Sequence, residues 1–160
     1  MLSDDTSAYF YEQIVEVTDN ANFAGRTKIL KFRQIFNNIF EKLTGEEKQF
    51  FSSIFSRVVY VIDKYELPDE LSSYIKKLRY FSKKALKDKE IEINDGDITA
   101  AAQILTRIVA HFSENDIPEA LQRLMDETIY TGDFWEYSHL YSETIPFLKV
   151  IIKKGKILDK

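Results

Sequence analysis

The sequence offers few side chains of the kinds that perform catalysis. It contains no cysteine, which excludes disulfides, thiolate metal sites and cysteine nucleophiles. Its five glycines are scattered, and the single Gly-Lys pair, Gly155 and Lys156, lacks the preceding glycine and the following hydroxyl of a phosphate-binding P-loop. We therefore expect no nucleotide hydrolysis by this chain and no cofactor.

Two histidines and several carboxylate pairs remain, and each has a structural explanation. His111 follows an apolar helical stripe, where a surface or half-buried histidine is commoner than a metal ligand. His139 stands four residues before Glu143, but two ligands without a third do not make a metal site. The acids Asp4 and Asp5 lie at a helix start, where the helix dipole favours negative charge. We predict no catalytic residue and no metal site.

The most unusual feature is the basic run "KKLRYFSKKALKDK" at residues 76–89. It carries seven basic residues and one acid in a chain whose net charge is −4. At about 100° per residue, its apolar side chains fall on one side of a helix and its cations on the other, with Tyr80 among them. No acid alternates with these cations, so ion pairs between successive helical turns do not account for them.

An aromatic ring among cations is typical of a surface that contacts a nucleic-acid backbone. We therefore predict a non-catalytic binding domain that contacts RNA, single-stranded DNA or another anionic partner. The residues expected to face it are Lys76, Arg79, Tyr80, Lys83, Lys84 and Lys87. Two alternatives stay open: a solvated face whose lysines serve solubility, and a surface that docks onto an acidic protein or a neighbouring domain.

The elements that must position these residues are helical. Glycines and the three prolines are sparse, and apolar residues recur mainly at helical spacing. This pattern predicts an all-α, up-and-down bundle of five to six helices within residues 1–127. The expected segments are about 6–20, 26–43, 46–65 and 69–88, a fifth whose apolar stripe runs over 98–112, and a shorter sixth after residue 116.

The third segment is apolar around most of its circumference, so we expect it to be the most buried element. Three helix starts also carry capping signals. Thr44 with Glu47 fits a capping box for the third helix. Asn94 or Asp95 is expected to cap the fifth helix, and Asp116 the sixth.

Residues 128–160 differ in character from the bundle. They hold the single tryptophan, several tyrosines and the β-like run "FLKVII" before a Lys-Gly turn. We interpret them as a short, partly β extension or as the start of a following domain. In the alternative function, a protein-interaction or homodimerisation module, the anchors would be Phe134, Trp135, Tyr137 and Tyr141.

Composition also bears on location. No apolar run approaches the ~20 residues that span a bilayer, and the first residues carry acids where a targeting peptide would carry bases. Together with the absence of cysteine, this favours a cytoplasmic protein without a membrane partner.

Residues 78–113 resemble the C-terminal half of HEPN-like helical domains, in particular a bacterial domain of unknown function, DUF4145. Leu78 and Arg79 match the Leu-Arg of that motif, whereas Lys83 and Lys87 stand where its asparagine and histidine would be. The resemblance implies the helical fold and a binding face. It argues against ribonuclease activity, because no imidazole is present at this motif to move a proton near neutral pH.

A second similarity concerns context. This chain is helical over most of its length and passes into β-like sequence near its end. In this it looks like the segments placed ahead of large bacterial nucleic-acid enzymes, including superfamily 1 helicases. This similarity implies that the chain is the leading domain of a longer nucleic-acid-processing or defence protein.

Overall fold

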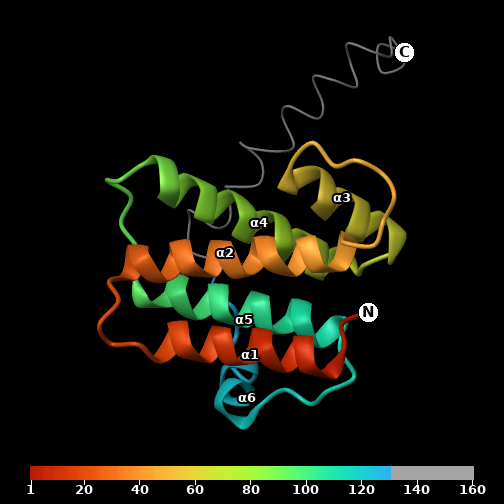
Figure 1. The fold of residues 1–160 in the computed structure, drawn as a ribbon. Helices are drawn as coiled ribbons and strands as arrows, with labels where there is room; N and C mark the ends of the chain where they lie inside the picture. Colours follow the sequence, from red (N-terminus) through yellow and green to blue (C-terminus); the bar gives the residue numbers. More distant parts are fainter. Residues whose placement is uncertain (131–160) are drawn as a thin grey trace.

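The structure, a computed structural model, describes residues 1–130. This part contains six α-helices and no strand, which confirms the predicted all-α bundle (Figure 1). The helices are α1 (Asp4–Asp19), α2 (Gly25–Thr44), α3 (Ile54–Lys64), α4 (Asp69–Lys87), α5 (Asp95–His111) and α6 (Glu119–Met125). The predicted β-like run and the four predicted aromatic anchors lie outside the described residues.

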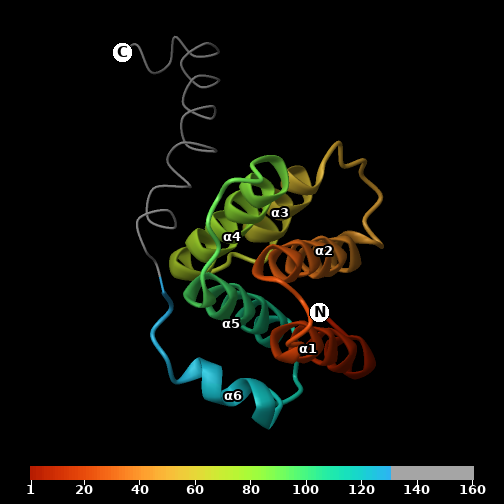
Figure 2. The ribbon, with the colours of Figure 1, turned by 90° about the vertical axis from the view of Figure 1, so that its left-hand side faces the viewer.

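The long helices pack around α5. This helix contacts α1, α2, α4 and α6, and α2 contacts α1, α3, α4 and α5. Figures 1 and 2 place α3 and α4 on one side of the bundle and α6 on the opposite side, below α1 and α5. None of the helices in the described range is long and apolar enough to cross a membrane.

The most buried element is α5, and our expectation for the third segment was wrong. Between residues 97 and 109, all but two side chains of α5 are buried. Its run Ala100–Ala102 has small side chains, so neighbouring helices can approach closely. In α3 only Val58 and Val61 are buried, whereas Val59 is 44% exposed. A high apolar content therefore did not identify the central helix.

The third helix is also shorter than its apolar pattern suggests. It begins at Ile54, after a stretch in which Phe50 is 88% exposed. Ser53 caps α3: its hydroxyl accepts a hydrogen bond from the backbone N–H of Ser56 at 3.2 Å. Serine side chains compete for backbone hydrogen bonds, which favours a helix start at this position.

Of the three predicted helix caps, the one on α5 is present and the other two are absent. Asn94, one of the two residues predicted to cap α5, does so: its side-chain oxygen accepts a hydrogen bond from the backbone N–H of Asp97 at 2.9 Å. The Asp97 carboxylate accepts a hydrogen bond from the backbone N–H of Asn94 at 3.0 Å. Thr44 does not cap α3; it ends α2, where its hydroxyl donates to the carbonyl of Phe40. Asp116 does not cap the sixth helix either, because α6 begins at Glu119 after Pro118.

Candidate nucleic-acid interface

The basic helix α4 is held by its apolar side. Its buried apolar residues are Leu71, Ile75, Leu78, Phe81 and Ala85, and the helix packs on α2 and α5. The acids Asp69 and Glu70 lie in its first turn, and Lys84 and Lys87 lie in its last turn. Both distributions suit the helix dipole, so part of the charge pattern of α4 has a purely structural reason.

The C-terminal end of α4 is fixed by a side chain that the sequence gave no reason to select. Arg26, near the start of α2, donates to the backbone carbonyls of Lys89 at 2.8 Å and Ile91 at 2.9 Å. It also donates to the carbonyls of Asp88 and Ala85. Helix C-termini leave carbonyl groups without helical partners, and here one guanidinium satisfies several of them. Arg26 thereby joins α4 and the segment after it to α2.

The predicted interface residues differ in their exposure to solvent. Lys87 is exposed, whereas Lys76, Tyr80, Lys83 and Lys84 are half-buried. We call Lys76, Lys77, Lys83, Lys84 and Lys87 the lysine face of α4. These five lysines occupy one arc of the helix. Four of them are half-buried, which is consistent with aliphatic chains that lie along the protein surface while the ammonium groups reach water.

Arg79 does not belong to this open face, contrary to the sequence-based prediction. It is 8% exposed, and its guanidinium lies over the ring of Phe55 in α3, 4.5 Å from the ring centroid. A four-residue step turns about 40° around a helix, so Arg79, Lys83 and Lys87 drift from the edge of the apolar side toward solvent. Arg79 stands at that edge, where α3 covers it.

Arg33 is a further cation at this position that sequence reasoning missed. Its Nη1 donates to the hydroxyl of Ser82 on α4, at 3.3 Å. Burial, and next the charge of Arg79, lower the pKa of Arg33. A signal was present in the sequence: Arg33 stands four residues after Ile29 and three before Phe36, so it interrupts the apolar stripe of α2.

Four of the five lysines in the lysine face form no ion pair with an acid of residues 1–130. Within residues 1–130, the ion pairs are Lys64 with Glu47 and Arg107 with Glu70. Neither pair includes Lys76, Lys77, Lys84 or Lys87. These four charges therefore remain available to an anionic partner as far as the described residues are concerned.

The pair Lys64–Glu47 belongs to a small polar cluster elsewhere on the surface. Hydrogen bonds from Lys64, and then from Tyr60, lower the pKa of Glu47. The same carboxylate raises the pKa values of Lys64 and Tyr60. The directions of these pKa shifts mean that the charged forms of the acid and the amine are stabilised by each other, as in a structural ion pair. They do not bring a group toward neutral pH for proton transfer.

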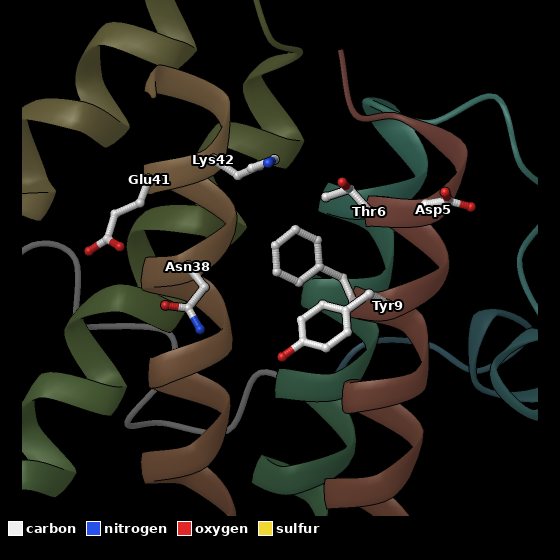
Figure 3. A pocket seen from close by; sticks show the side chains of 7 residues that line it. Asp5, Thr6, Tyr9, Asn38, Glu41 and Lys42 are labelled. Atoms are coloured by element: carbon white, nitrogen blue, oxygen red, sulfur yellow. The ribbon is translucent and has the colours of Figure 1, made fainter. Parts of the chain in front are cut away.

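A groove between α1 and α2 is one of several surface hollows of residues 1–130 that could hold a ligand (Figure 3). It encloses about 520 Å³ and is lined by Asp5, Thr6, Tyr9, Phe10, Asn38, Glu41 and Lys42. The view shows Thr6 and Tyr9 on α1 facing Asn38 and Lys42 on α2. The groove contains neither a histidine nor a cluster of metal ligands, and no such cluster occurs within the described residues. His111 is exposed, as expected, and its ring packs edge-on against Phe112.

The geometry thus provides a cationic helix face and two adjoining arginines. Comparisons of this chain with protein-family models, with curated proteins and with solved structures found no match.

Proposed function

We propose that this chain is a non-catalytic binding domain that contacts single-stranded nucleic acid through the lysine face of α4. The observation that carries the proposal is the charge of that face. Lys76, Lys77, Lys84 and Lys87 share one side of a helix, and no acid of residues 1–130 forms an ion pair with them. Like charges at this spacing repel one another, and a row of phosphates relieves that repulsion.

The distribution of charge over the chain supports a local interface. The net charge is −4 despite the basic run, so the remaining surface is acidic and repels a polyanion. Tyr80 lies on the same arc of α4 as the lysine face, and aromatic side chains among cations are typical of surfaces that bind single strands. The HEPN-like resemblance stays a prediction. It agrees with this proposal because a degenerate motif with Lys87 in place of histidine would bind RNA without cleaving it.

The test compares two charge-reversed variants. One variant is Lys76→Glu, Lys84→Glu and Lys87→Glu; its matched control is Lys42→Glu, Lys48→Glu and Arg123→Glu, which changes the net charge equally at exposed positions. Binding of a dye-labelled 20-nucleotide RNA or single-stranded DNA is followed by fluorescence anisotropy at several salt concentrations.

We expect wild-type affinity to fall with salt, with a slope of about 0.7 in log K for each phosphate contacted. The lysine-face variant should lose both the binding and the salt dependence, and the control should keep most of both. Equal losses in the two variants would show a non-specific charge effect. If the wild type binds neither RNA nor single-stranded DNA, the proposal is wrong.

A second candidate, a protein-interaction or dimerisation module, rests on a different surface. Phe50 is 88% exposed and Val59 is 44% exposed. A phenylalanine as exposed as Phe50 is unusual in a helical bundle, and exposed apolar side chains can mark a contact surface. Light scattering over a range of concentrations separates the two candidates. A dimer that dissociates on Phe50→Ser would favour this module, whereas a monomer at all concentrations would exclude homodimerisation.

A further inference from the structure

The last described residues bring the chain to the first turn of α5. The buried side chain of Gln103, on α5, donates to the backbone carbonyls of Leu124 at 2.7 Å and Glu127 at 3.1 Å. At the end of this segment the ring of Tyr130 packs against Gly96, where an added Cβ atom would lie 3.1 Å from two ring carbons. Figure 2 shows the segment, in blue, rising from α6 past α5. The chain therefore leaves the described residues beside the start of α5.

The lysine face of α4 is within reach of the chain at that point. Helices α4 and α5 contact each other, and residues 88–94 connect the end of α4 directly to the start of α5. Between Lys76 and Lys87 the lysine face extends about 17 Å along the helix axis. A chain as long as residues 131–143 can span about 40 Å. The segment that follows Tyr130 is thus long enough to cover the whole face.

The sequence after residue 130 is complementary in charge to the lysine face. Residues 131–148 contain three acids, Asp133, Glu136 and Glu143, and neither lysine nor arginine. Four lysines of the face form no ion pair with an acid of the described residues. Opposite charges attract most strongly where no nearer partner neutralises them. The acids of this stretch are therefore suitable partners for the lysines of α4.

Apolar contacts can join the two segments as well. Leu86, in the last turn of α4, is 52% exposed. Contact with an aromatic ring removes such a side chain from water, which stabilises the contact. Phe134 and Trp135 stand between two of the acids. The stretch thus combines acids with aromatic rings, and the surface of α4 combines lysines with an exposed leucine.

We infer that residues 131–143 fold back onto the lysine face of α4, with their three acids against its lysines. Attachment to the same chain gives this segment an effective concentration of about millimolar, which favours it over a second copy or a separate acidic protein. A few surface ion pairs stabilise a contact only modestly, so a strand with many phosphates displaces the segment. Under the proposed function, on which this consequence rests, residues 131–143 compete with nucleic acid for α4 and limit its binding.

The first measurement uses the full chain without nucleic acid. Trp135 is the only tryptophan of the chain, so its fluorescence reports on this segment alone. The wild type is compared with the lysine-face variant and with an acid-neutralised variant, Asp133→Asn, Glu136→Gln and Glu143→Gln. In both variants, and in the wild type at high salt, we expect emission at longer wavelength and stronger quenching by acrylamide, because the contact is lost.

A matched control neutralises three exposed acids of α1, by Glu12→Gln, Glu16→Gln and Asp19→Asn. It changes the net charge as the acid-neutralised variant does, and it should keep the wild-type emission. Far-ultraviolet circular dichroism checks that every variant keeps its helices. The emission should also be independent of protein concentration. A contact that forms only at high concentration would identify a second copy as the occupant and overturn the inference.

The second measurement uses the dye-labelled single strand. The acid-neutralised variant should bind it about tenfold more tightly than the wild type does, the effect expected when three modest surface ion pairs no longer compete. The control on α1 should change the affinity much less, because salt screens exposed charges at a distance.

The outcomes separate this inference from the proposed function. If the lysine-face variant leaves the emission and the quenching of Trp135 unchanged, the contact is wrong whatever the protein binds. If the emission responds as expected but no variant binds a strand, the contact stands and the proposed function fails. If the emission responds and the acid-neutralised variant binds the strand no more tightly than the wild type, the competition is overturned.

Discussion

Arg26, Arg33 and Arg79 carry the same charge and have three different surroundings. Arg26 donates to several backbone carbonyls, Arg33 to one hydroxyl, and Arg79 lies on an aromatic ring. The guanidinium permits all three because it is planar, weakly hydrated and rich in donors. The role of each arginine therefore follows from the helix that packs opposite it.

The role of Arg26 leads to a prediction about stability. Arg26→Ala should lower the free energy of unfolding by about 1.5–3 kcal/mol, because the carbonyls at the end of α4 lose a charged donor. Urea denaturation measures this change. Arg123→Ala, at an exposed position on α6, is the control and should stay within about 0.5 kcal/mol of wild type. A similar, small effect of both substitutions would mean that water replaces the Arg26 contacts without cost.

At the scale of the helices, α5 takes the central, most buried position that the sequence pattern predicted for α3. The residues of α5 are less bulky, yet they are buried between α1, α2, α4 and α6. The third helix is amphipathic and leaves Val59 in solvent. A central helix needs small side chains on some faces so that several neighbours can pack closely, and α5 meets this requirement with its alanines.

Two truncations compare these helices directly. Ile104→Ala in α5 should cost about 2–5 kcal/mol of unfolding free energy, because it leaves a cavity in a fully buried site. Val59→Ala in α3 should cost less than about 0.5 kcal/mol, because that side chain already contacts water. Thermal or urea unfolding measures both, and a large loss for Val59→Ala would instead support a central α3.

For the whole molecule, the arrangement around α5 should set the order in which parts of the chain open. The N-terminal segment is tied to the end of α5, because the N–H of Leu2 donates to the carbonyl of Phe112 at 2.8 Å. The side chain of Asn115 also donates to the carbonyl of Asp4 and to the hydroxyl of Ser7. Contacts between distant parts of the sequence thus converge on α5 and α1.

Hydrogen exchange tests this arrangement. Amides in the middle of α5 should exchange slowest, with protection near the global unfolding free energy, because they open only when the bundle does. Amides of residues 45–53, which lie outside any helix and include exposed Phe50, should exchange fastest among residues 4–125. Mass spectrometry of short peptides resolves both regions, and equal protection of α3 and α5 would contradict the central position of α5.

Local patterns made part of this structure predictable. Helical spacing predicted five to six helices and most of their bounds, and a few adjacent residues narrowed the cap of α5 to Asn94 or Asp95. The direction of the lysine face followed from the turn of a single helix. These features depend on residues within one or two helical turns, so the sequence by itself determined them.

The tertiary structure alone decided what the helices place against one another. It buried Arg79 beneath Phe55, brought Arg33 to Ser82 and gave Arg26 the carbonyls that follow α4. It also made α5 the centre of the bundle in place of the third segment. Each of these outcomes depends on which faces of two helices meet and at what angle, and that choice is made by packing over the whole bundle, which no periodicity within one helix records.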